Sequence, residues 1–217
     1  MSELSRLLKK AEKRPLKVCL SHGDRAGLDV GIPPKLRDYR DPLFDLVPAN
    51  AKVAVEIGTM QGWFAWRCLK FLPAGCHIYS IDPHFDSEPY GDGSYNRDCY
   101  LKNMSCPESE GRAVLVPQTG VEAAISWPED RLVDFIFIDG GHTKEDVLAD
   151  LRGWFPLMRP GALLSGHDIS GTFETPVKAA LEEFAAEAGI PEIHIGEVYS
   201  FTGTQVTDCW WFYKGGK

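Results

Sequence analysis

From Lys52 onward, short apolar runs of strand length alternate with longer segments of helical pattern. The apolar runs are hydrophobic at nearly every position, as in parallel strands that are covered on both faces. This alternation predicts an α/β protein built on a doubly wound sheet. The expected strands are Val53–Ile57, His77–Ile81, Ala113–Val116, Val133–Ile138 and Ala162–Ser165. The expected helices are Trp63–Phe71, Tyr95–Met104, Gly120–Ser126 and Thr143–Leu157.

The C-terminal part of the chain adds one more helix and two more strands. The helix has a clear apolar stripe and ends near Gly189 and Pro191, residue types that commonly follow a helix. The strand-like runs are Ile193–Phe201 and Asp208–Tyr213, with Trp210–Phe212 expected in the core of an antiparallel hairpin. The sequence therefore predicts a Rossmann-like, doubly wound sheet of seven strands, mostly parallel, with a C-terminal antiparallel hairpin.

The first fifty residues differ in pattern from the rest. A short helix is expected over Ser2–Arg14 and a second over Asp41–Leu46, with loop residues between them. We interpret residues 1–50 as an N-terminal helical and loop accessory segment, and residues 51–217 as the α/β domain.

The composition excludes several function classes. The net charge of −8 over 217 residues argues against a general nucleic-acid or anionic-membrane binder, because phosphate contacts need clustered lysine and arginine. No run is long and apolar enough to span a bilayer, and the N-terminus lacks the apolar core of a secretory signal. The six cysteines are scattered without a Cys-x-x-Cys pair, so we expect reduced thiols in a cytoplasmic protein rather than disulfides or a zinc site.

The turn after the first expected strand carries two glycines and an acid. Gly58 permits a tight turn and a close approach of backbone to a ligand, and Gly62 lets the next helix pack closely. The nicotinamide fingerprint Gly-x-Gly-x-x-Gly is absent, because Met60 stands at the second glycine position. Glu56 would repel a pyrophosphate but suits a ligand with a cationic amine or sulfonium.

A second acid, Asp82, ends the next expected strand. A carboxylate at this position is placed to accept hydrogen bonds from a ribose diol. Alternatively, Asp82 only caps the turn at Pro83. We favour the ribose role, because Glu56 and Gly58 lie in register on the neighbouring strand.

Four polar groups follow the fourth and fifth expected strands. Asp139 and His142 follow Val133–Ile138, and His167 and Asp168 follow the next strand. Because neighbouring parallel strands end at the same edge of a sheet, these groups should converge there. Two carboxylates and an imidazole are suitable ligands for a divalent metal, and a neutral histidine is a suitable proton acceptor.

Each of these groups also has a purely structural interpretation. Asp139 could cap the helix that follows it, and His142 could pack at the junction of strand and helix. His167 and Asp168 could bind only each other and nearby backbone. The convergence of four such groups at one edge favours a functional site.

These motifs resemble those of the class I S-adenosylmethionine-dependent methyltransferases. More narrowly, the chain is similar to the branch that includes the macrocin and mycinamicin sugar O-methyltransferases and the cephalosporin-hydroxylase-like proteins. The resemblance runs from about Lys52 to Tyr213. Its carriers are Val55–Gly58, Ile81–Pro83, Phe137–His142, Asp150–Leu151 and Gly166–Asp168, of which the Asp-Gly-x-His motif is the most specific.

The resemblance implies a cofactor site for S-adenosyl-L-methionine. Glu56 and Gly58 would lie near its methionine part, Asp82 would bind its ribose, and Asp139 would lie between cofactor and metal. His142 would act as the general base that takes a proton from a substrate hydroxyl.

The resemblance also implies a divalent metal such as Mg²⁺ or Mn²⁺. Asp139, His167 and Asp168 would be its ligands, with the histidine standing where several family members carry an acid. An oxygen and nitrogen donor set suits manganese or iron as readily as magnesium.

The expected reaction is methyl transfer to a hydroxyl of a small molecule, a sugar or natural product. Phe85–Arg97 is either a substrate lid or a plain surface loop. The alternatives are an NAD(P)-dependent oxidoreductase and a catalytically silent methyltransferase-like binding protein. We expect neither nucleic acid nor membrane as partner, and a homo-oligomer is possible.

Overall fold

A computed structural model describes residues 40–86, 91–105, 111–169, 174–199 and 205–215 of the chain. The expected helix Ser2–Arg14 and most of the expected accessory segment lie outside these residues. Of that segment, the structure describes the short helix η1 (Asp41–Leu46), a 3-10 helix at the residues where the sequence predicts a helix.

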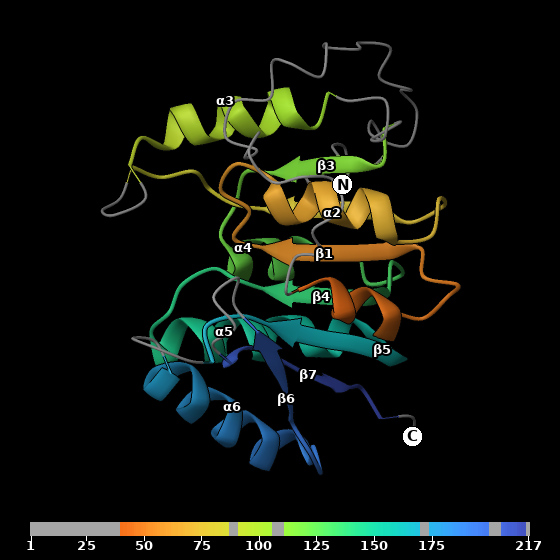
Figure 1. Cartoon of the computed structure of the whole chain (residues 1–217), viewed down its shortest axis with the longest axis vertical. Helices are drawn as coiled ribbons and strands as arrows, with labels where there is room; N and C mark the ends of the chain where they lie inside the picture. Colours follow the sequence, from red (N-terminus) through yellow and green to blue (C-terminus); the bar gives the residue numbers. More distant parts are fainter. Residues whose placement is uncertain (1–39, 87–90, 106–110, 170–173, 200–204, 216–217) are drawn as a thin grey trace.

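The sheet has seven strands and is mostly parallel (Figure 1). Its order is β3-β2-β1-β4-β5-β7-β6, with β7 antiparallel to both of its neighbours. The predicted Rossmann-like sheet with a C-terminal antiparallel hairpin is therefore confirmed. The strands are β1 (Val53–Ile57), β2 (His77–Ile81), β3 (Ala113–Val116), β4 (Val133–Ile138), β5 (Met158–Gly166), β6 (His194–Tyr199) and β7 (Gln205–Tyr213).

Helices cover both faces of the sheet (Figure 1). One apolar cluster joins the sheet to α4, α5 and α6, and contains Trp154 and Trp210. The other joins the opposite face to η1, α2 and α3, and contains Phe64 and Phe135. The helices are α2 (Trp63–Phe71), α3 (Gly93–Asn103), α4 (Gly120–Ser126), α5 (Lys144–Trp154), η2 (Phe155–Leu157) and α6 (Glu174–Ala188).

α3 and β5 are among the elements that differ from their predicted bounds. α3 begins at Gly93, because the Asp92 carboxylate caps it by accepting a hydrogen bond from the backbone N–H of Tyr95 at 3.0 Å. Part of the expected loop Phe85–Arg97 is therefore helix, while its residues 87–90 lie outside the described chain. β5 is longer than predicted, because it already begins at Met158, which pairs with β4. The residues directly after Met158 are exposed and carry no apolar pattern.

The strand order places a crevice where β1 and β4 meet. β1 is followed in the chain by β2 on one side, whereas β4 lies on its other side. Ligands of doubly wound sheets bind at such a switch point, outside the carboxyl ends of the strands. Among the helices that the structure describes, none is long and apolar enough to cross a membrane.

Candidate active site

The loop after β1 packs directly against the loop after β4. Gly58 has a φ of +82°, and its backbone N–H donates to the carbonyl of Ile81 at 2.9 Å. A Cβ atom at Gly58 would lie 2.1 Å from the backbone oxygen of Asp139. Gly58 is therefore required for the positive φ and for the close approach of two loops.

Glu56 is a fully buried acid on β1 with neutral hydrogen-bond donors. Its Oε2 accepts from Thr59 Oγ1 at 2.6 Å and from Ser80 Oγ at 2.9 Å. Burial outweighs these hydrogen bonds and raises the pKa of Glu56 to about 8. A carboxyl group of this kind is suited to a cationic ligand, which would favour its ionised form.

Asp82 holds the loop after β1 in place. Its Oδ2 accepts from the backbone N–H groups of Thr59 and Met60, at 3.0 and 2.8 Å. Its Oδ1 accepts from the backbone N–H of His84 at 2.7 Å, so it also closes the turn at Pro83. Asp82 thus caps the turn at Pro83, as the alternative interpretation predicted, and also holds the loop after β1, which the sequence did not reveal. Its ribose role stays a prediction.

Backbone strain is concentrated at this edge of the sheet. The described non-glycine residues with positive φ are Met60, His84 and Asp168, which follow β1, β2 and β5 respectively. The His84 ring contributes to the local order, because its Nε2 lies 2.7 Å from the carbonyl oxygen of Met60. Strained backbone of this kind clusters at functional sites.

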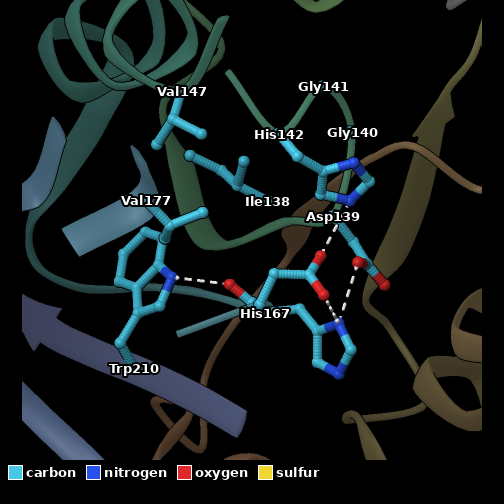
Figure 2. Close-up of a pocket in the computed structure, with 10 residues that line it drawn as sticks. Ile138, Asp139, Gly140, Gly141, His142, Val147, His167, Val177 and Trp210 are labelled. Atoms are coloured by element: carbon cyan, nitrogen blue, oxygen red, sulfur yellow. Dashed lines mark hydrogen bonds and ion pairs between the residues drawn. The ribbon is translucent and has the colours of Figure 1, made fainter. Parts of the chain in front are cut away.

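The four predicted polar groups after β4 and β5 do meet (Figure 2). His142 Nε2 lies 2.8 Å from Asp168 Oδ2. His167 Nδ1 lies 3.2 Å from Asp139 Oδ1 and 3.3 Å from Asp168 Oδ1. Figure 2 also shows the hydrogen bond from the Trp210 indole N–H to the His167 carbonyl, which is 3.1 Å long.

The carboxylates and imidazoles of this cluster alter each other's protonation. The hydrogen bond to Asp168 raises the pKa of His142 above its ordinary value, against the opposing effect of burial. Burial would raise the pKa of Asp168, but hydrogen bonds from His142 and His167 hold it well below its usual range. The cluster therefore favours an ionised Asp168 beside a more basic His142.

Part of this cluster has the geometry of a metal site. One ligand atom each from Asp139, His142 and Asp168 lies within 4.8 Å of the other two. Two carboxylates and one imidazole are a suitable donor set for a divalent cation. The predicted set contained His167 in place of His142, and both rings contact the Asp168 carboxylate.

Arg40 is a site residue that sequence reasoning missed. Its Nη1 lies 3.6 Å from Asp139 Oδ2, and its guanidinium lies over the Phe64 ring, 5.8 Å from the centroid. Arg40 precedes η1, far from Asp139 in sequence, and no local motif signals the contact. It brings positive charge to the mostly acidic site.

One cavity of about 890 Å³ joins the two groups of predicted residues. Glu56, Gly58 and Asp82 line one part of it. Asp139, His142, His167 and Asp168 line another. All seven predicted site residues therefore border a single space at the carboxyl ends of the strands, large enough for a cofactor and part of a substrate.

Solved structures with the same fold include enzymes of more than one activity. The O-methyltransferase TomG from Streptomyces achromogenes, involved in tomaymycin synthesis and solved with S-adenosylmethionine, has a TM-score of 0.64 at 13% identity, over 99% of this chain and 100% of that one. An O-methyltransferase from Bacillus cereus, solved with S-adenosylhomocysteine, has a TM-score of 0.62 at 17% identity, over 97% and 90%. A precorrin-8w decarboxylase from Methanobacterium thermoautotrophicum has a TM-score of 0.57 at 18% identity, over 85% and 93%. At these identities the likeness shows the fold alone.

The family of the chain follows from its sequence and not from these structures. Residues 55–169 match a family described as a methyltransferase domain, and this stretch is just over half of the chain. It runs from β1 to the residue after Asp168 and so includes every predicted site residue. The match favours the methyltransferase interpretation over the oxidoreductase, while the narrower macrocin-like branch stays a prediction. The chain belongs to this methyltransferase family.

Proposed function

We propose that this protein transfers a methyl group from S-adenosyl-L-methionine to a hydroxyl group of a small molecule, a sugar or natural product. The observation that carries the proposal is the single cavity of about 890 Å³. In a chain of the methyltransferase family, this cavity brings the Glu56 and Asp82 side next to the Asp139, His142 and Asp168 side. A methyl donor and an acceptor could therefore meet in one space.

Two observations support the cofactor. The TomG and Bacillus cereus structures, which share the fold, hold S-adenosylmethionine and S-adenosylhomocysteine. Within the described part of the chain, the hydrogen-bond donors to the buried Glu56 carboxyl are two hydroxyl groups, and its raised pKa suits a ligand with an ammonium and a sulfonium group. Asp82 would bind the ribose while it also holds the loop of Thr59 and Met60.

The chemistry asks little of the protein beyond alignment and removal of one proton. The sulfonium methyl is already activated, so the acceptor oxygen, the methyl carbon and the sulfur need to be held in line. His142 would donate its Nε2–H to Asp168 and accept the hydroxyl proton at Nδ1, the other ring nitrogen. Asp168, 2.8 Å from Nε2, would stabilise the imidazolium that forms.

A divalent metal fits the residues present. Asp139 and Asp168 would supply carboxylate oxygens, and an imidazole would complete the set. We favour His167 as that imidazole, because a His142 ring bound to a metal would be a poor proton acceptor. A bound metal would lower the pKa of an acceptor hydroxyl.

The cofactor is tested by isothermal titration with S-adenosylhomocysteine, with NADH as the comparator. We expect the wild-type protein to bind S-adenosylhomocysteine and not NADH. Asp82→Ala should lose most of this binding, because it removes the ribose acceptor and frees the loop after β1. No binding by the wild type, or a preference for NADH, would refute the proposed function.

The base is tested by His142→Gln in single-turnover methylation of a panel of sugar and phenol acceptors. We expect the rate to fall by a factor of about 100 or more, the usual contribution of a general base, with cofactor affinity kept. His167→Gln should instead shift the dependence on added Mg²⁺ or Mn²⁺ after treatment with a chelator. A chelated enzyme as active as the loaded one would exclude the metal from the proposal.

A further inference from the structure

Asp150, on α5, is a buried carboxyl group with no hydrogen-bond or ion-pair partner among the described residues. Its exposure is 6%, and it has no hydrogen bond or ion pair within the part of the chain that the structure describes. Burial raises its pKa to about 7. The other buried acids of the described chain, Asp41, Glu56 and Asp134, all accept hydrogen bonds. Buried polar groups normally form hydrogen bonds. The absence of a donor to Asp150 among the described residues therefore needs an explanation.

The carboxyl group of Asp150 borders the cofactor cavity beside two glycines. Asp150 lines the cavity of about 890 Å³ together with Gly120, Val121 and Gly140. A Cβ atom at Gly120 would lie 2.0 Å from Asp150 Oδ1, and one at Gly140 would lie 3.8 Å from Asp150 Oδ2. The carboxylate therefore packs against the backbone of both glycines, and as part of the cavity lining it borders the space that a ligand would occupy.

The position of Asp150 within the cavity indicates which part of the ligand it would meet. This step rests on the proposed function. The methyl group has to point toward His142 and Asp168, and the ribose has to reach Asp82, the residue that follows β2. The adenine of the cofactor would then lie against the part of the cavity that follows β3. There α4 begins at Gly120, and Val121 is 40% exposed. An adenine in that position presents its 6-amino group as a hydrogen-bond donor, the kind of partner that Asp150 lacks among the described residues.

We propose that Asp150 accepts a hydrogen bond from the 6-amino group of the cofactor's adenine, and that it thereby selects a 6-amino purine over a 6-oxo purine. The selection follows from the chemistry of a carboxylate. It has acceptors only, so it pairs with the N–H of an amino group and repels the oxygen of a 6-oxo group.

The test compares S-adenosylhomocysteine with S-inosylhomocysteine, which carries oxygen in place of the 6-amino group. Titrations at about pH 8.5 keep the Asp150 carboxyl ionised. The wild type should bind S-adenosylhomocysteine at least about tenfold more tightly, the effect of one hydrogen bond to a charged group. In Asp150→Ala the two affinities should become nearly equal. Asp150→Asn should bind the 6-oxo ligand more tightly than the wild type does, because its amide supplies an N–H donor to the oxygen.

Glu145→Gln is the matched control, since it removes a carboxylate from the exposed side of the same helix. It should keep the wild-type preference. A preference that survives in both Asp150 variants would overturn the proposal, as would an equal loss of both ligands, which would indicate a structural role for Asp150. If Asp150→Ala does not fold, the nearly isosteric Asp150→Asn decides. A wild type that binds both ligands equally overturns only the role of Asp150, whereas one that binds neither refutes the methyltransferase proposal as well.

Discussion

At the scale of single residues, Glu56 makes the stability of the protein depend on pH. Its pKa rises from 4.5 to about 8 on burial, so the folded state holds a proton that the unfolded state releases. The contribution of Glu56 to stability is fully present below a pH of about 4.5 and is lost as the pH rises through about 8.

Glu56→Gln should remove this dependence, because the amide oxygen still accepts from Thr59 and Ser80 and carries no charge. The melting temperature of the variant minus that of the wild type should increase between about pH 5 and about pH 8.5. Thermal unfolding monitored by circular dichroism over this range measures the difference. A constant difference would mean that Glu56 is ionised throughout.

Gly58 and Gly161 separate two costs of replacing a glycine. Both have φ near +80°, but a Cβ atom meets the Asp139 backbone at Gly58 and nothing within 4 Å at Gly161. Gly161→Ala should therefore cost about 1–2 kcal/mol of unfolding free energy, from backbone conformation alone. Gly58→Ala should cost about 1–3 kcal/mol more, because the two loops must also separate. Urea unfolding measures both, and equal values would contradict the close packing of the loops.

At the scale of elements, one buried ion pair attaches η1 to the sheet domain. The Arg67 guanidinium on α2 donates to the Asp41 carboxylate, with Nε at 2.7 Å from Oδ1. Both side chains are buried. Asp41→Ala should cost about 3–5 kcal/mol, because it leaves a buried charge without its partner.

The control for this prediction is Arg152→Ala, which breaks an exposed pair with Glu187 between α5 and α6. Exposed ion pairs contribute little to stability, so the unfolding free energy should fall much less in this variant. Chemical unfolding of both variants provides the comparison. A similar loss in both would show that burial does not determine the strength of the Arg67–Asp41 pair.

Some elements could be predicted closely from the sequence, because buried strands consist mostly of apolar residues. β1 to β4 match their predicted bounds, since each is a short run of apolar residues that ends where polar or glycine residues begin. The start of β5 was missed, because Arg159 and Pro160 are exposed and give no apolar signal. The start of α3 was missed because its Asp92 cap is a local geometry within a glycine-rich stretch.

The candidate site was predictable to the extent that strand ends determine it. Asp139, His142, His167 and Asp168 converge because two neighbouring parallel strands end there. The contact of Arg40 with Asp139 joins residues far apart in the chain, so no local sequence motif predicts it. The position of the Asp150 carboxyl at the cavity could not be predicted from the sequence either, because it depends on glycines in two other segments.

At the scale of the whole molecule, the cavity couples cofactor binding to global stability. A ligand that binds only the folded state stabilises it by mass action, by about 2.7 kcal/mol at a concentration of about 100 times Kd. S-adenosylhomocysteine should therefore raise the melting temperature of the wild type in a concentration-dependent way. Asp82→Ala should show a much smaller shift at the same concentrations. An equal shift in both proteins would contradict the role of Asp82 in the cofactor site.

The strand order also sets the sequence of events during synthesis. β7 lies between β5 and β6, yet it follows both in the chain. While the ribosome has made β6 but not β7, β6 has no neighbour in the sheet, and β5 presents an unpaired edge along residues such as Leu163 and Leu164. Open edges of this kind invite pairing with other chains. A nascent chain that pauses after Tyr199 should thus need a chaperone more than one that has passed Tyr213.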